Sequence, residues 1–166
     1  VEGKDFKAFI AGYDAGYRHP RVLLLIGLTN RDEYVVVDEF YQKEINLSDA
    51  ITYFEDMVDR DNFRTVYADP SARAEIEEMK KQGIRVEGGD NEVETGIQKV
   101  KEFLSNDNLF ISDKCKKTIE EFNSYRWKDD KDAPVKEKDH AMDALRYAIY
   151  THESSGDAGV VMLNDW

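Results

Sequence analysis

Apolar residues gather along the chain in short runs whose lengths suit β-strands, separated by polar turns. Such runs cover residues 6–13, 21–28, 33–41 and 64–68, and a shorter one covers residues 84–86. The second run is apolar at nearly every position, which is typical of a central strand buried on both faces. Because the first three runs are joined by short connections, they predict an antiparallel meander.

Elsewhere the apolar residues recur every three or four positions, which predicts helices. One helix is predicted to begin at Ser48, which fits as its N-cap. Another is predicted from Pro70 to about Gln82, because proline suits a first helical turn and Gly83 suits a helix end. Three further helices are predicted over residues 92–105, 114–125 and 138–152. Residues 153–166 are expected to form a disordered tail.

The predicted order is three strands, a helix, a strand, a helix and a strand, followed by helices. A three-stranded meander followed by βαβ units fits the ribonuclease H-like architecture. We therefore predict an α/β domain over residues 1–152. Its mixed five-stranded sheet would contain three antiparallel strands followed by parallel strands, with helices flanking the sheet. In that topology the first and fourth strands are neighbours.

Three aspartates occupy positions that this topology would bring together at one edge of the sheet. Asp14 ends the first predicted strand, Asp69 follows the fourth, and Asp143 lies in the first turns of the last predicted helix. Neighbouring strands would bring Asp14 and Asp69 to one edge of the sheet, and the last helix would bring Asp143 against them. Carboxylates that converge cannot all stay ionised unless a cation joins them, so these residues predict a divalent-metal site.

A pair of divalent ions suits phosphodiester hydrolysis. Two ions about 4 Å apart can activate water, stabilise the leaving oxygen and neutralise a phosphate. In this hypothesis the ions are Mg²⁺ or Mn²⁺, Asp14 bridges them, Asp69 holds one and Asp143 holds the other. His140 can share a helix face with Asp143 and bind metal, position water or relay a proton. Asp139 is a further, accessory candidate.

Each of these residues also has a purely structural interpretation. An aspartate after a strand often forms a turn, Asp69 can cap the helix that follows it, and Asp143 can pair with Arg146. His140 can be an ordinary exposed histidine, and Asp139 can be a first-turn acid favoured by the helix dipole. The metal-site hypothesis therefore depends on the three aspartates converging.

Length and charge narrow the class of protein. The 166 residues suit one domain, and the net charge of −12 argues against a protein that coats nucleic acid. Residues 99–138 nevertheless hold ten basic and nine acidic residues, so this segment is the favoured surface if DNA binds. The lysines expected to contact DNA are Lys114, Lys116, Lys117, Lys128 and Lys131. A solvated surface of mixed charge is the alternative.

Several sequence signals are missing from the chain. It has no run of about 18 apolar residues that could cross a membrane, no signal-peptide pattern, and a single cysteine, which excludes an internal disulfide framework. The first residues, which lack an initiator methionine, look like the start of a piece cut from a longer chain. We expect a soluble, intracellular protein that does not contact membranes.

Three motifs resemble those of one family, the nuclease domain of tailed-bacteriophage large terminase subunits. They are Tyr13-Asp14-Ala15-Gly16, Tyr67-Ala68-Asp69-Pro70-Ser71 and, most specifically, Lys138-Asp139-His140-Ala141-Met142-Asp143-Ala144-Leu145-Arg146-Tyr147. The resemblance covers about residues 7–151. One difference is Ala15, where the family often has proline, and this difference concerns the stiffness of the loop.

The resemblance implies an RNase H/RuvC-like endonuclease that cuts concatemeric viral DNA with two Mg²⁺ or Mn²⁺ ions. It implies metal-ligand roles for Asp14, Asp69 and Asp143, with His140 at an accessory position. It also implies double-stranded DNA as substrate, the portal and the small terminase subunit as partners of the full-length protein, and a place in the host cytoplasm. Because the chain contains no phosphate-loop motif, the family's packaging ATPase is not expected in it.

Two rival functions stay open at this stage. Another RNase H-like nuclease, such as a Holliday-junction resolvase, would have the same fold and the same acids. A non-catalytic acidic domain that docks onto a packaging protein would use the aspartates only as caps. Strong preference for four-way DNA junctions would favour the first rival, and failure to bind Mn²⁺ would favour the second.

Overall fold

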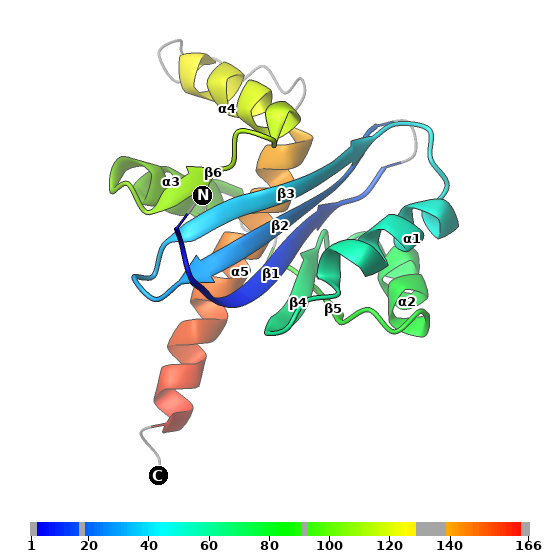
Figure 1. Ribbon diagram of the computed structural model, residues 1–166, viewed down its shortest axis with the longest axis horizontal. Helices are drawn as coiled ribbons and strands as arrows, with labels where there is room; N and C mark the ends of the chain where they lie inside the picture. Colours follow the sequence, from blue (N-terminus) through cyan, green and yellow to red (C-terminus); the bar gives the residue numbers. More distant parts are fainter. Residues whose placement is uncertain (1–2, 17–18, 91–92, 129–138, 164–166) are drawn as a thin grey trace.

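A single mixed β-sheet with helices on both faces forms the molecule (Figure 1). The computed structural model describes residues 3–16, 19–90, 93–128 and 139–163, and for residues 93–94, 125–128 and 156–163 it describes the backbone alone. The strands are β1 (Phe6–Asp14), β2 (Arg21–Thr29), β3 (Tyr34–Gln42), β4 (Phe63–Ala68), β5 (Val86–Gly88) and β6 (Leu109–Ile111). The helices are α1 (Leu47–Val58), α2 (Arg73–Lys81), α3 (Val93–Ser105), α4 (Lys116–Lys128) and α5 (His140–Leu163).

The sheet has the topology expected of a ribonuclease H-like domain. Its strands lie in the order β5-β4-β1-β2-β3-β6. β1, β2 and β3 form the antiparallel meander, and β4 pairs in parallel with β1, which confirms that the first and fourth strands are neighbours. The described residues form six strands rather than the five predicted, because Leu109–Ile111 pairs in parallel with β3.

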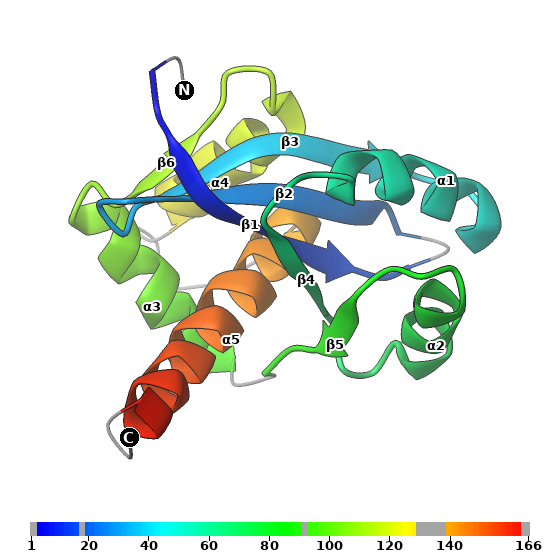
Figure 2. The ribbon, with the colours of Figure 1, turned by 60° about the horizontal axis from the view of Figure 1, so that its bottom comes forward.

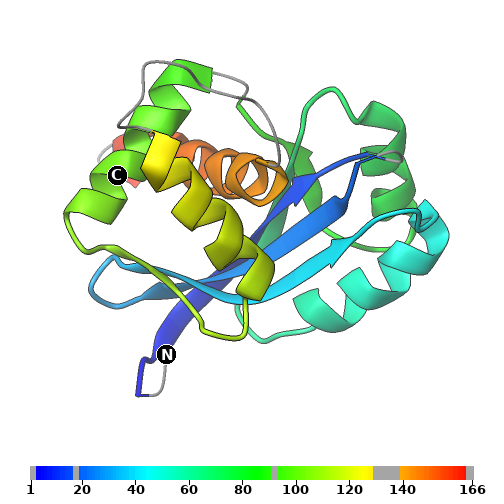
Figure 3. The ribbon, with the colours of Figure 1, turned by 90° about the horizontal axis from the view of Figure 1, so that it is seen from above.

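Alternate residues of the central strand face opposite sides of the sheet and build two core layers. In β2, Val22 and Leu24 belong to the layer that includes Val100 of α3 and Leu145 of α5, whereas Leu23 belongs to the layer beneath α1 and α2. Figure 3 shows α3, α4 and α5 gathered on one side of the sheet. The apolar run at residues 21–28 therefore marks a strand buried on both faces, as predicted.

Three elements begin at residues other than those predicted: α1 begins earlier, and α2 and β5 begin later. The N-cap of α1 is Asn46 rather than Ser48, because the Asn46 side chain accepts the N–H of Asp49 at 2.9 Å. α2 begins at Arg73, after a turn in which the N–H of Ala72 donates to the carbonyl of Asp69 at 3.0 Å. β5 covers Val86–Gly88 instead of residues 84–86.

The last helix is longer than predicted. α5 does not end near His152 but continues to Leu163, and Figure 2 shows it projecting beyond the sheet. Contacts with the sheet hold its middle turns, since the hydroxyl of Tyr34 donates to Glu153 and that of Tyr67 lies 3.5 Å from Nδ1 of His152. The expectation of a disordered tail over residues 153–166 does not hold for residues 153–163, which continue the helix, and residues 164–166 lie outside the described residues. No helix in the described ranges, α5 included, has the length and apolar character needed to cross a membrane.

α5 lies directly on β1 because one residue of the strand has no side chain. A Cβ atom at Gly12 would lie 2.0 Å from the carbonyl oxygen of Ala144 and 3.1 Å from the Cβ of Ala148. Both alanines are fully buried. Since Gly12 precedes Asp14 by two residues and Ala144 follows Asp143, this close contact sets the distance between the strand and helix that carry the predicted site.

Candidate metal centre

Asp14 is the last residue of β1 and is only 6% exposed. Its register partner on β2 is Val22, and the preceding Tyr13 lies opposite Ala68 of β4. Oδ2 of Asp14 lies 2.9 Å from Nδ1 of His140, the first residue of α5. β1 and α5 therefore bring together two predicted site residues that are 126 positions apart.

Asp69 directly follows β4, and its backbone N–H donates to the carbonyl of Tyr13 at 3.1 Å. This hydrogen bond places Asp14 and Asp69 at the same edge of the sheet, on adjacent strands. Oδ1 of Asp69 accepts hydrogen bonds from the backbone N–H of Ser71 at 2.9 Å and from its hydroxyl at 2.8 Å. Asp69 thus forms a turn, but it does not cap α2, whose N-cap residue Ala72 makes no side-chain capping bond.

Asp143 lies one turn into α5, and its N–H donates to the carbonyl of Asp139 at 2.8 Å. Nη2 of the buried Arg146 lies 3.4 Å from Oδ1 of Asp143. The structural pairing considered for Asp143 therefore exists. Asp143 still lies within electrostatic reach of Asp14, whose charge raises its pKa.

The carboxylates influence one another's protonation. Burial raises the pKa of Asp14, the hydrogen bond from His140 lowers it, and the charges of Asp69 and Asp139 raise it again. Burial is the largest of the causes that raise the pKa of Asp143 to about 6, the charges of Asp139 and Asp14 act in the same direction, and Arg146 opposes them. The acids are therefore close enough to repel one another, which is the condition under which a divalent cation binds favourably.

The side chains would have to rearrange to coordinate an ion. Among the described residues, no three acidic, histidine or cysteine side chains lie close enough together to hold a metal as they stand. Oδ2 of Asp14 is engaged by His140 and Oδ1 of Asp69 by Ser71, so these oxygens are turned toward protein donors. The chemistry of the set still fits, because carboxylate oxygens are the ligands that Mg²⁺ and Mn²⁺ prefer. A shared coordination by Asp14, Asp69 and Asp143 stays a prediction.

Four of the five predicted DNA-contacting lysines belong to the described backbone, and they lie on α4 or just before it. Nζ of Lys114 lies 3.8 Å from Oδ1 of Asp38, and Nζ of Lys117 lies 3.5 Å from Oε2 of Glu120. Lys116 is the first residue of α4. The side chain of Lys128 and the whole of Lys131 lie outside the described residues. A role for these five lysines in binding DNA stays a prediction.

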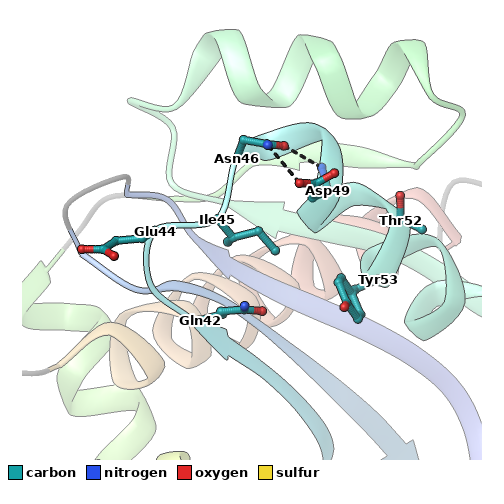
Figure 4. A pocket seen from close by; sticks show the side chains of 7 residues that line it. All are labelled: Gln42, Glu44, Ile45, Asn46, Asp49, Thr52 and Tyr53. Atoms are coloured by element: carbon teal, nitrogen blue, oxygen red, sulfur yellow. Dashed lines mark hydrogen bonds between the residues drawn. The ribbon is translucent and has the colours of Figure 1, made fainter.

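A polar hollow of about 550 Å³ lies where β3 leads into α1. Figure 4 shows Gln42, Glu44, Asn46 and Tyr53 around it. Gln42 pairs in register with Arg21, so the hollow shares an edge of the sheet with the aspartates. None of the predicted site residues lines it, and its acidic rim does not suit a nucleic acid.

One buried residue beside the site was not predicted. Glu121 of α4 is 6% exposed, and its Oε1 accepts the backbone N–H of Ala141 at 2.9 Å and that of Met142 at 3.3 Å. Thr118, three positions earlier on α4, is also buried, but a threonine and a glutamate at this spacing form no apolar pattern that would indicate burial. The partners of Glu121, 20 and 21 positions away, could not be inferred from the sequence pattern.

The strand order and directions define an RNase H-like α/β domain with acids at the ends of two adjacent strands and on a helix packed against them. Residues 14–151 match the family described as the terminase RNase H-like domain. The chain belongs to this family, which confirms the resemblance to phage large terminase subunits seen in the sequence.

Individual relatives agree with this assignment. The large terminase subunit of Escherichia phage T5 is 25% identical over a 160-residue alignment, and the match covers 89% of this chain and 36% of that protein. The solved large terminase of a thermophilic bacteriophage has a TM-score of 0.78 at 27% identity, covering 89% of this chain and 41% of that chain. The chain therefore spans less than half the length of either relative.

A second solved structure matches over most of both chains. The nuclease domain of the bacteriophage SPP1 large terminase, with bound Mn, has a TM-score of 0.64 at 20% identity. The match covers 86% of this chain and 85% of that chain. At this identity the similarity shows a common fold.

Proposed function

We propose that this chain is a metal-dependent endodeoxyribonuclease that cuts concatemeric viral DNA during packaging. The observation that carries the proposal is the meeting of β1, β4 and α5 at one edge of the sheet. There Asp69 is hydrogen-bonded to the strand that ends in Asp14, and His140 is hydrogen-bonded to Asp14 itself. The family of the chain and the Mn bound to the SPP1 domain support a divalent cation as its cofactor.

The chain's contribution to catalysis is to hold charged groups on rigid elements. Asp14 would bridge two Mg²⁺ or Mn²⁺ ions, Asp69 would hold one of them and Asp143 the other. When bound, these ions supply an activated water and neutralise the charge of the scissile phosphate. Strand ends and a closely packed helix position ligands more rigidly than loops do. Cleavage on this scheme leaves a 5′ phosphate and a 3′ hydroxyl.

His140 would orient Asp14 and hold a proton at its edge of the site. The hydrogen bond to Asp14 is the main cause that raises the pKa of His140, so the imidazole keeps its proton to a higher pH than an ordinary histidine. Asp139 would act as an accessory acid, because its charge raises the pKa values of both Asp14 and Asp143.

The proposed substrate is double-stranded DNA, read through its backbone rather than its sequence. Lysines at the start of α4 would contact phosphates, which implies binding that weakens as salt rises. As part of a longer large terminase subunit acting in the host cytoplasm, the domain would meet the portal and the small terminase subunit. ATP hydrolysis would belong to another part of that protein.

Plasmid cleavage with Mn²⁺ tests the assignment. Asp14→Asn, Asp69→Asn and Asp143→Asn should each nearly abolish cutting, because each removes a ligand charge. Asp56→Asn, on the exposed side of α1, is the matched control and should cut at the wild-type rate. Wild-type activity in any of the three site variants would remove that residue from the proposed site.

Two further measurements separate the rival functions. Cleavage of a four-way junction should be no faster than cleavage of a linear duplex, and a strong junction preference would favour a resolvase. Calorimetry should detect Mn²⁺ binding to the wild-type protein and weakened binding to Asp14→Asn. If the wild-type protein neither binds Mn²⁺ nor cuts DNA, the chain is better described as a docking domain.

A further inference from the structure

The first turn of α5 is capped by a residue from another helix. In an α-helix the first backbone N–H groups have no partner within the helix, and the side chain at the N-cap position usually accepts one of them. α5 begins at His140, so Asp139 occupies the N-cap position. The N–H groups of Ala141 and Met142 are nevertheless bound by Oε1 of Glu121, from α4.

Because Glu121 makes these bonds, the carboxylate of Asp139 is not needed as the helix cap and can interact with the other acids of the proposed site. Within the described residues, the bonds that an N-cap side chain would make are already made by Glu121. Asp139 instead acts on the other acids, since its charge raises the pKa of Asp14 and that of Asp143. Glu121 thus accepts the hydrogen bonds that the side chain of Asp139, the N-cap residue, would normally accept.

The helix that carries Glu121 is hydrogen-bonded to the sheet at its first turn. Three positions earlier on α4, Thr118 donates to Oε2 of Glu39 through its backbone N–H at 2.8 Å and its hydroxyl at 2.5 Å. Glu39 belongs to β3, and Oε1 of the same carboxylate accepts the N–H of Lys117 at 2.9 Å. α4 is therefore hydrogen-bonded to β3 through Lys117 and Thr118 and to the first turn of α5 through Glu121.

The residues bound by Glu121 lie between two residues of the proposed site. Ala141 and Met142 separate His140 from Asp143, so a shift of their backbone moves both side chains. Asp14 does not move with them, because it is fixed in β1 between β2 and β4. The position of Asp143 and His140 relative to Asp14 therefore depends on the anchor that Glu121 provides.

We propose that Glu121 is a positioning residue: it holds the first turn of α5 so that Asp139, His140 and Asp143 face Asp14 and Asp69. This inference rests on the proposed metal-dependent function. Glu121 touches neither substrate nor the reacting atoms in this scheme. Its carboxylate acts through the backbone of α5, and any side chain with an acceptor oxygen at the same place can do the same.

The test compares Glu121→Gln with Glu121→Ala. The amide oxygen of glutamine can accept both N–H bonds, so Glu121→Gln should keep Mn²⁺ affinity and plasmid cutting within about threefold of wild type. Glu121→Ala removes the acceptor and should weaken Mn²⁺ binding and lower kcat, each by on the order of tenfold or more. Hydrogen exchange of the Ala141 and Met142 amides, measured by NMR without metal, should accelerate only in the alanine variant.

Ile76→Ala is the control for a general loss of stability. Ile76 is a buried residue of α2, on the opposite face of the sheet from α5. The control should lower the melting temperature while leaving Mn²⁺ affinity and the exchange of the two α5 amides unchanged. All variants are assayed at a temperature where circular dichroism shows them folded.

The outcomes separate this inference from the function on which it rests. If wild type binds Mn²⁺ and cuts DNA, and folded Glu121→Ala does the same with equal affinity and rate, the positioning role is wrong and the nuclease assignment stands. If wild type neither binds Mn²⁺ nor cuts, the nuclease assignment fails and this proposal fails with it. Equal loss of function in Glu121→Gln and Glu121→Ala would also contradict the anchoring role.

Discussion

Nδ1 of His140 lies 2.9 Å from Oδ2 of Asp14, and each residue changes the other's affinity for protons. Asp14 is the main cause that raises the pKa of His140, and the hydrogen bond from His140 opposes the effect of burial on the pKa of Asp14. When protonated, the imidazole of His140 therefore places a positive charge beside the carboxylate that is proposed to bridge the ions.

Binding of Mg²⁺ is expected to lower the pKa of His140. A divalent cation on Asp14 repels the imidazolium and draws the carboxylate away from its hydrogen bond. The chain has three histidines, so their titrations can be followed separately by NMR with and without saturating Mg²⁺. His152, whose pKa is lowered by its own burial, serves as the internal control and should not respond. An unchanged His140 titration at proven saturation would place the ion elsewhere.

Gly12→Ala is expected to damage both stability and activity. Its Cβ would lie 2.0 Å from the carbonyl oxygen of Ala144, so α5 must move away from β1. Overpacking of this kind costs about 1–3 kcal/mol of unfolding free energy. Displacing Asp143 from Asp14 by about 1 Å can lower the cleavage rate on the order of 100-fold.

Gly88→Ala is the matched control for this substitution. Its nearest neighbours would be the Cα and Cβ atoms of Pro70, at 3.6 Å, which is ordinary van der Waals contact. Denaturant unfolding and plasmid cleavage should both stay close to wild type. Similar losses in Gly88→Ala and Gly12→Ala would show that the close approach of α5 to β1 is not what matters.

Asp143→Asn is expected to stabilise the metal-free protein at neutral pH while abolishing cleavage. The fold raises the pKa of Asp143 from 3.8 to about 6. A carboxyl whose pKa is raised on folding favours the folded state while it is protonated. This contribution to the unfolding free energy is fully present below pH 3.8 and is lost as pH rises through about 6, where the carboxyl ionises in the folded protein. After allowance for solvent screening, the gain in Asp143→Asn at pH 7.5 should be about 1 kcal/mol.

The raised pKa of Asp143 makes the gain in unfolding free energy of Asp143→Asn depend on pH. At pH 3.5 the carboxyl of wild-type Asp143 is itself neutral. The part of the difference in unfolding free energy that comes from its charge should therefore vanish, and only a pH-independent difference between Asp and Asn should be left. Urea unfolding of both proteins in the presence of a chelator, at several pH values, measures the difference. A difference that does not grow between pH 4 and pH 7 would contradict the raised pKa.

Mn²⁺ affinity is expected to rise with pH below about pH 6 and to level off above it. Ligand carboxylates must lose their protons before they bind a cation, and the pKa of Asp143, one of the three proposed ligands, is raised to about 6. Calorimetric titrations at pH 5 and pH 7 should differ by roughly tenfold in Kd. Equal affinities would mean that Asp143 is not a ligand.

Much of the fold could be predicted because burial leaves a local record in the sequence. The run at residues 21–28 predicts a strand buried on both faces, and the order of strands and helices was enough to place β4 beside β1. Asp14 and Asp69 could be singled out because they end such runs, and they do lie at one edge of the sheet. The parallel pairing of Leu109–Ile111 with β3 was missed, because this strand is too short to carry a clear local pattern.

Other features depend on contacts between distant residues, which local patterns do not record. The sequence predicted an end of the last helix near His152, but Tyr34 and Tyr67 bind residues 152 and 153 and hold the helix to the sheet. Glu121 looks like one more charged residue of a helix until the fold places it at the start of α5.

The sequence by itself determined which segments are buried, in what order they follow one another, and where the acids fall at their ends, because these depend on hydrophobic periodicity along the chain. Only the tertiary structure decided how close those acids come and which protein groups now engage their oxygens. Those distances arise from the direct contact of α5 with Gly12 and from hydrogen bonds between residues that are far apart in the sequence.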